Sequence, residues 1–153
     1  MQAGLSGALI VVDSPEAHDP EHDIVLLMTA PRKNEHRDVV LLNGSAKPPA
    51  REMRVGQHYR LRLINVHTFR PNMRMRLRSN AGDGSDSTLR WRPVAKDGMD
   101  LPSDQRIERA AEIQMGNGET YDFDFVPSNP GDFQFEVSAR TGIVLVSMPF
   151  RVR

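Results

Sequence analysis

The sequence predicts an all-β protein, a β-sandwich or Greek-key barrel. Apolar and polar residues alternate with a period of two along most of the chain, and helical spacing is nearly absent. Turn-forming residues separate most of these alternating runs, of which there are roughly ten. The 153 residues suit one domain with a short extension, because a domain usually contains about 100 to 150 residues.

The first part of the chain contains an apolar run, a charged linker and several short strands. Residues 5–12 are apolar without alternation, as in a strand buried on both faces, and residues 13–22 contain two prolines and several charges, as in a linker. Gly56 and Gln57 predict a hairpin turn between the last two strands of this part. The strands expected here are residues 23–29, 39–42, 52–55 and 59–65.

Three later segments repeat an alternation of apolar residues with arginine. In YRLRLIN, residues 59–65, the aromatic and leucine side chains share one face and the arginines share the other. The same pattern occurs in MRMRLR at residues 73–78 and in LRWRPVA at residues 89–95, where Pro93 requires a sheet edge or a bulge. An Asp-Gly turn and an irregular or single-turn segment at 101–108 follow. The last strands are expected at residues 111–115, 121–125, 133–137 and 143–152.

Composition excludes several classes of function. Lysine plus arginine and aspartate plus glutamate each total 20, so no overall positive field would attract nucleic acid or an anionic membrane. The absence of cysteine excludes disulfides, thiolate zinc sites, thiol nucleophiles and the cysteine ligand of a blue-copper centre. The longest apolar run, residues 8–12, is far shorter than the ~20 residues that span a bilayer, and no leader sequence is expected in the chain as given.

The arginine-bearing strand faces have two interpretations. The favoured one is a solvated outer face with cross-strand ion pairs to Asp122, Asp124 and Glu136. The alternative is an interface with an acidic partner domain or an anionic substrate. The candidate interface residues are Arg60, Arg62, Arg74, Arg76, Arg90 and Arg92.

Histidines and carboxylates offer weak candidate sites. His18 and His22 lie among Asp19, Glu21 and Asp23 and are weak candidate metal ligands, but a solvated linker without the groups that orient metal ligands is the favoured interpretation. The other histidines, His36, His58 and His67, are expected to be surface or hydrogen-bonded structural residues. A hydrolase that uses carboxylates of the segment 97–108 is a third and weaker hypothesis.

Several longer motifs occur in a family-specific order. GLSGALIV at residues 4–11 precedes the linker and DIVLLM at 23–28. The motifs that follow are LLNGS at 41–45, VGQHYRLRLIN at 55–65, VAKDGMDL at 94–101, GETYDFDF at 118–125 and NPGDFQFEV at 129–137. This order resembles that of multicopper oxidases, laccase-like enzymes built from successive cupredoxin domains. In the resemblance, GLSGALIV is similar to the strand that ends the first domain, and the remaining motifs are similar to the second domain.

The resemblance implies a domain without copper. The family binds type 1 copper with two histidines and a cysteine, and its trinuclear cluster with four His-x-His pairs. Where a copper-bearing domain has His-Pro-x-His-x-His, this chain has RPNMRMR at residues 70–76; where such a domain has His-Cys-His, it has Glu136, Val137 and Ser138. No catalytic or cofactor-binding residue is therefore expected in this chain, and copper is expected only in a parent enzyme.

The resemblance also implies an organisation and a role. Residues 1–20 would be the terminal strand of a preceding cupredoxin domain plus a linker, and residues 21–153 a cupredoxin-like Greek-key domain that positions its neighbours. Its partners would be the neighbouring cupredoxin domains of the same polypeptide, in a periplasmic or secreted enzyme that oxidises a substrate and reduces O2 to water. The isolated chain is expected to be inactive, and its N-terminal strand would drive homo-oligomer formation if that strand belongs to a missing neighbour. The alternative is a stand-alone β-sandwich binding or adhesion module.

Overall fold

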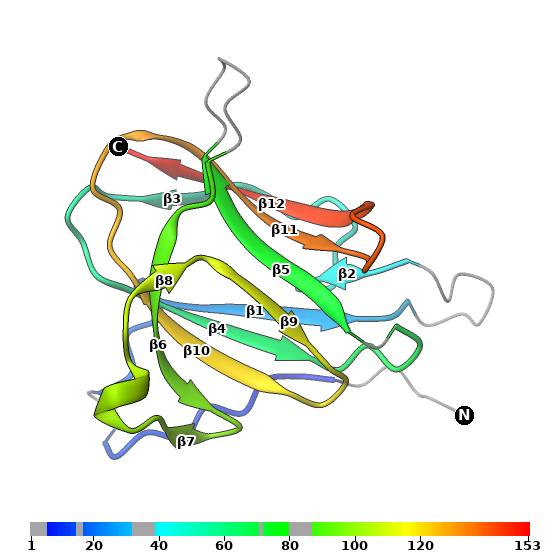
Figure 1. Cartoon of the computed structure of the whole chain (residues 1–153), viewed down its shortest axis with the longest axis horizontal. Helices are drawn as coiled ribbons and strands as arrows, with labels where there is room; N and C mark the ends of the chain where they lie inside the picture. Colours follow the sequence, from blue (N-terminus) through cyan, green and yellow to red (C-terminus); the bar gives the residue numbers. More distant parts are fainter. Residues whose placement is uncertain (1–5, 15–16, 32–38, 71, 80–86) are drawn as a thin grey trace.

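The computed structural model is a sandwich of two β-sheets (Figure 1). It describes residues 6–14, 17–31, 39–70, 72–79 and 87–153. Across these residues no helix is long and apolar enough to cross a membrane. The first sheet contains, in spatial order, β2 (Leu41–Leu42), β1 (Asp23–Thr29), β4 (Tyr59–Asn65), β10 (Thr120–Phe125), β6 (Arg90–Lys96) and β7 (Met99–Asp100), with β8 (Arg109–Ala110) also paired to β6. The second contains β3 (Arg51–Met53), β12 (Val144–Val152), β11 (Gly131–Ser138), β5 (Met73–Ser79) and β9 (Glu112–Met115).

The predicted alternation places the apolar faces in one core between the sheets. In β4 the residues of one face are buried and the arginines of the other are only partly exposed, and β5 has the same pattern. The rings of Trp91 and Phe123 stack at the centre with centroids 3.9 Å apart and an interplanar angle of 16°. The all-β sandwich predicted from the sequence is thus confirmed, while its Greek-key connectivity stays a prediction.

One segment closes the sandwich by passing from one sheet to the other. β8 pairs with β6 of the first sheet and β9 pairs with β5 of the second, with the fully buried Ala111 between them. The Ala111 N–H donates to the Leu89 carbonyl at 2.7 Å, and the Ala111 carbonyl accepts the Leu77 N–H at 2.8 Å. These backbone hydrogen bonds connect the two sheets at this corner.

Pro93 lies at an irregularity in β6, as its chemistry requires. In the pairing with β10, Asp122 is opposite Ala95 and the next residue, Phe123, is opposite Pro93, so one residue of β6 is left without a partner. Proline cannot donate to a sheet ladder and is confined to such positions or to edges. The prediction of an edge or bulge at Pro93 is therefore confirmed, and so is a single turn in 101–108, where a 3-10 helix, η3, spans Ser103–Gln105.

The hairpin predicted across Gly56 is wrong. β3 pairs in parallel with β12 in the second sheet, whereas β4 pairs with β1 and β10 in the first. Gly56 does adopt a positive φ of 75°, but the turn carries the chain between sheets. The Tyr59 hydroxyl accepts the Arg54 N–H at 2.8 Å and fixes this crossing.

The strand predicted at residues 5–12 is also not observed. Residues 6–12, the part described, belong to no strand, and Leu9 and Val11 are 88% and 86% exposed. Ser6 and Ala8 line a groove with residues of β1 and β2. A continuous apolar run has two apolar faces. The groove beside β1 and β2 covers only the face of Ser6 and Ala8, so the face of Leu9 and Val11 remains in solvent.

The Asp-Gly turn between β6 and β7 yields a stability prediction. Asp97 and Gly98 have φ values of 49° and 79°, as in the tight turns that connect hairpins, and a Cβ added at Gly98 would meet no atom within 4 Å. Gly98→Ala is therefore expected to lower the free energy of unfolding by about 1 kcal/mol through backbone strain alone. Urea denaturation measures this loss; Gly7→Ala, also in open space but without a positive φ, is the control and should be neutral. An equal effect of the two variants would contradict the assignment.

Candidate functional site

The arginines on the outer face of β4 are paired within the domain. Arg62 donates to Asp122 at 2.6 Å and to Asp23 at 2.9 Å, and the Arg60 Nε–H donates to the same Asp122 oxygen at 3.0 Å. The side chains of Arg62, Asp23 and Asp122 are each at most 15% exposed. Asp122 on β10 and Asp23 at the start of β1 therefore neutralise both cations across neighbouring strands.

The arginines of β5 form a second network around a buried carboxylate. Glu136 on β11 is 6% exposed, and its two oxygens accept from Arg76 at 3.1 Å and from Arg78 at 2.7 Å. Arg74 lies at 3.4 Å from Glu112 of β9, in a pair whose side chains are about 40% exposed. Exposed pairs of this kind contribute only about 0.2 to 1 kcal/mol, whereas a buried carboxylate depends strongly on its partners.

The arginines of β6 are the most exposed of the predicted set. Arg90 is 3.2 Å from Glu108, and Arg92 has no carboxylate partner in the described part of the chain. Asp124, predicted to pair with an arginine, instead lies 3.3 Å from His58. Five of the six candidate interface arginines thus have carboxylate partners in their own domain, which supports the favoured interpretation; their role in an interdomain interface stays a prediction.

The two segments that would carry copper ligands lie side by side. Arg74 of β5 is opposite Ser138 of β11, and Arg76 is opposite Glu136. The Ser138 hydroxyl donates to the Arg74 carbonyl at 3.4 Å. These groups do not fit copper, because a guanidinium is always protonated and copper sites use imidazole and thiolate. Among the described residues no three histidine, aspartate, glutamate or cysteine side chains gather as a metal site.

Both linker histidines have a carboxylate neighbour. His22 Nδ1 is 2.6 Å from Asp19, and His18 Nδ1 is 3.5 Å from Asp23. The hydrogen bond with His22 lowers the pKa of Asp19 below its ordinary value. His22 is hydrogen-bonded to Asp19, and His18 lies within ion-pair distance of Asp23, but no metal-ligand group of three is formed within the described residues.

A buried polar pair lies at the end of β4. His67 was expected to be a surface or hydrogen-bonded structural residue, and it is buried and hydrogen-bonded, whereas Asn65 was not singled out from the sequence. Asn65 and His67 are both fully buried; the Asn65 amide donates to the Gly116 carbonyl at 2.9 Å and accepts the His67 N–H at 3.1 Å. His67 Nε2 is 3.1 Å from the Val39 carbonyl, while its Nδ1 has no partner among the described atoms. The signal in the sequence was available, because Asn65 continues the inward series of Tyr59 and the two leucines with a polar side chain.

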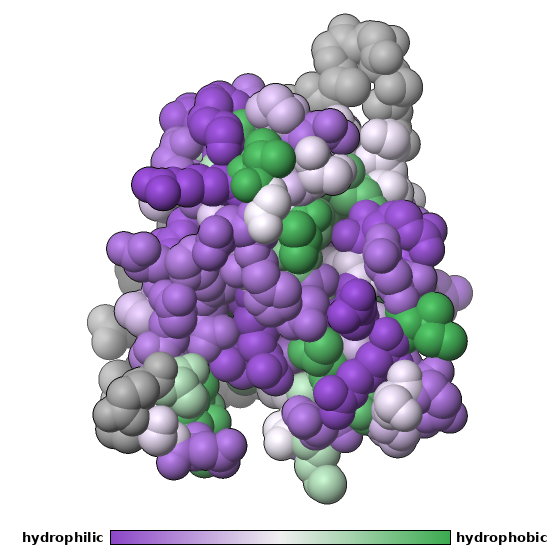
Figure 2. Space-filling model, turned by 90° about the vertical axis from the view of Figure 1, so that its left-hand side faces the viewer, coloured by the Kyte–Doolittle hydropathy of each residue, from purple (hydrophilic) through white to green (hydrophobic). Residues whose placement is uncertain are grey.

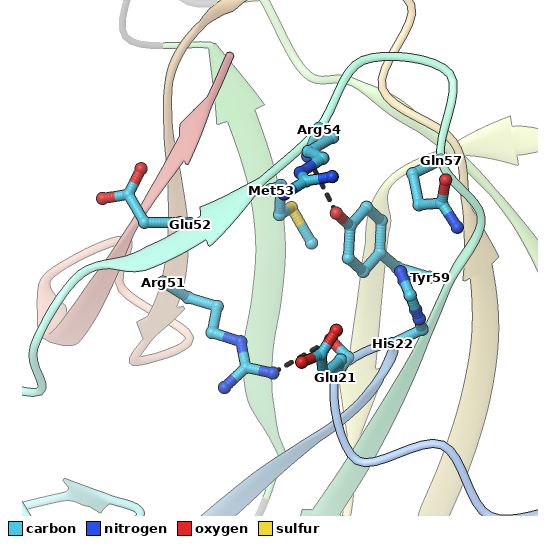
Figure 3. Close-up of a pocket in the computed structure, with 8 residues that line it drawn as sticks. All are labelled: Glu21, His22, Arg51, Glu52, Met53, Arg54, Gln57 and Tyr59. Carbon is cyan, nitrogen blue, oxygen red and sulfur yellow. Dashed lines mark hydrogen bonds between the residues drawn. The ribbon is translucent and has the colours of Figure 1, made fainter.

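A polar cleft of about 540 Å³ lies between the linker and the crossing from β3 to β4. Figure 3 shows the residues around it: Arg51 and Arg54 come from β3 and its end, His22 from the linker, and Tyr59 from β4. Arg51 donates to the Pro20 and Glu21 carbonyls at 3.1 and 2.9 Å, which holds the linker against β3. The side of the molecule that faces left in Figure 1 is largely hydrophilic, with hydrophobic side chains in smaller patches (Figure 2).

Solved structures with the same fold are copper enzymes. A variant of the multicopper oxidase McoA from the hyperthermophile Aquifex aeolicus matches with a TM-score of 0.63 and 19% identity over 86% of this chain and 32% of that chain. Another multicopper oxidase matches with a TM-score of 0.61 and 18% identity over 90% of this chain and 46% of that chain. A copper-containing nitrite reductase from Thermus scotoductus matches with a TM-score of 0.60 and 14% identity over 90% of this chain and 32% of that chain.

These matches define the fold. The chain is a cupredoxin-like β-sandwich of the kind found in multicopper oxidases, as its motif order predicted. No family model matches the chain, and no curated protein matches its sequence. The chain spans between about a third and about half of the length of the solved structures described above.

Proposed function

We propose that the chain is the copper-free cupredoxin domain of a laccase-like multicopper oxidase, with an architectural role between copper-bearing neighbours. The observation that carries the proposal is the pairing of β5 with β11, where Arg76 and Glu136 form an ion pair at the place of the expected copper ligands. The parent enzyme would bind copper in other domains, oxidise a substrate and reduce O2 to water. This domain would bind no copper, and alone it would be inactive.

The exposed N-terminal segment supports an interdomain role. Residues 1–20 are assigned to the end of a preceding cupredoxin domain and the linker, and residues 21–153 to this domain. Leu9 and Val11 are almost fully exposed in the described segment, which is unfavourable for apolar side chains unless another surface covers them. A neighbouring cupredoxin domain of the same polypeptide is the partner proposed for this segment, and the parent enzyme would be periplasmic or secreted.

The flanking coding sequence tests the proposal directly. His-x-His pairs upstream and a His-Cys-His motif downstream, in the same reading frame, are expected for a multicopper oxidase. If neither flank encodes such motifs, the oxidase assignment fails and the stand-alone β-sandwich binding or adhesion module becomes the better interpretation.

The oligomeric state of the isolated chain tests the role of the N-terminal segment. If Leu9 and Val11 face a missing domain, the 153-residue chain should associate with a second copy at micromolar concentration, and Leu9→Ser with Val11→Ser should reduce this association. Light scattering coupled to size exclusion measures both. A chain that remains monomeric at all concentrations would contradict the exposed segment as a contact surface.

A further inference from the structure

The cleft beside the linker differs from the outer faces of β4 and β5 in the partners of its arginines. All the arginines of β4 and β5 have carboxylate partners within the domain. Arg51 and Arg54, which both line the cleft, have no ion pair with any carboxylate in the described residues, and Arg51 uses one nitrogen on two backbone carbonyls. Two guanidinium groups without anionic partners thus lie at one opening.

The two carboxylates that line the cleft form no ion pair with these two arginines. Glu52 is directed away from the opening in Figure 3 and lies 3.6 Å from Arg151 outside it. Glu21 lines the cleft but has no ion pair with Arg51 or Arg54. The lining thus contains two arginines and two glutamates, but the guanidinium groups keep N–H donors that no carboxylate of the described residues accepts.

The Tyr59 hydroxyl adds a neutral donor to the lining. Tyr59 is 3% exposed, and its hydroxyl oxygen accepts the Arg54 backbone N–H, so its own proton has no acceptor among the described groups. The His22 ring lies 5.2 Å from the Tyr59 ring, and its Nδ1 is hydrogen-bonded to Asp19, so His22 packs beside the hydroxyl and is not counted among the donors. The Tyr59 O–H is therefore free to donate to an acceptor bound in the cleft.

We propose that this cleft binds a small oxyanion, a carboxylate or a phosphate. Guanidinium groups present paired N–H donors that match both anions, and charge-assisted hydrogen bonds of this kind are roughly twice as strong as neutral ones. Arg54 and the free N–H groups of Arg51 supply the cationic donors, and the Tyr59 hydroxyl supplies a neutral one. The site is independent of the oxidase assignment, because every residue in it belongs to this chain.

Titration of the ¹⁵N-labelled chain with sodium acetate and, separately, with sodium phosphate tests the proposal. Sodium chloride keeps the ionic strength constant, so that screening does not change during the titration. Saturable shifts of the Arg54 and Gln57 amide signals are expected with at least one anion, and the anion that saturates at lower concentration identifies the preferred class. Shifts that remain linear with both anions would overturn the proposal.

Two variants and a matched control locate the site. Arg54→Gln, at an exposed position, should weaken binding roughly tenfold or more, and Tyr59→Phe should weaken it by a smaller factor. Arg92→Gln removes a guanidinium that also lacks a carboxylate partner in the described part of the chain but lies outside the cleft, and it should leave the affinity unchanged. If Arg92→Gln and Arg54→Gln weaken binding equally, the anion responds to overall charge and the assigned site is wrong.

Discussion

Replacing Trp91 with alanine is expected to lower the free energy of unfolding by about 4 kcal/mol. Trp91 is 1% exposed, and its ring stacks on Phe123 between the two sheets. The substitution removes the largest side chain of the core and leaves a cavity that the surrounding strands can fill only in part. Urea denaturation followed by circular dichroism measures the loss.

Trp91→Phe is the matched control for this prediction. It keeps an aromatic ring against Phe123, and it removes an indole N–H that has no hydrogen-bond partner among the described atoms. We therefore expect it to cost less than half as much as Trp91→Ala. If the alanine variant lost less than about 1 kcal/mol, Trp91 would not lie in a packed core.

Replacing Glu136 with glutamine is expected to lower the free energy of unfolding by about 3 kcal/mol. Both oxygens of this buried carboxylate accept hydrogen bonds from arginines of β5. Glutamine keeps the shape but removes the negative charge and one acceptor, so that two guanidinium groups lose their shared counterion on a partly buried face.

The exposed ion pair between Arg74 of β5 and Glu112 of β9 provides the comparison for the buried Glu136. Glu112→Gln removes the partner of Arg74, where both side chains are about 40% exposed, and should change stability by less than about 1 kcal/mol. The midpoints of urea denaturation of the two variants measure the difference. Equal losses at Glu136 and Glu112 would show that burial of the ion pair has no energetic consequence.

The strands were predictable from sequence wherever one face of the strand is apolar. Tyr59, Leu61 and Leu63 alternate with arginine, and the structure buries the first set in β4. Periodicity of this kind specifies which residues share a face, because side chains of a strand alternate between its two sides. The chemistry of proline predicted a sheet edge or a bulge at Pro93, and the structure has an irregularity of the β6–β10 pairing there.

The partners of the strands were not predictable in the same way. Gly56 allows a turn, and the same positive φ serves a hairpin or a passage between sheets, so the sequence around it could not distinguish them. The strand predicted at residues 5–12 is not observed for a related reason. An apolar run indicates that packing partners are needed, but the described chain covers only one side of residues 6–12. Pairing depends on residues that are distant in sequence, and no local pattern contains that information.

The candidate site was predictable only in part for the same reason. Asp122 and Glu136 were correctly expected as partners of arginines, because they alternate on strands of their own, but Asp124 pairs with His58. The cleft was missed, since Arg51 contacts the carbonyls of Pro20 and Glu21 across about thirty residues of sequence. Its lining groups become neighbours only when β3 joins the second sheet and β4 the first.

Copper content after exposure of the purified chain to excess Cu(II), followed by desalting, is the most direct test of the central claim. The account predicts far less than equimolar copper and no blue absorption band, because the segments of β5 and β11 offer guanidinium, carboxylate and hydroxyl groups that pair with one another or with neighbouring strands. Retention of equimolar copper with a blue band would contradict the assignment of a copper-free cupredoxin domain.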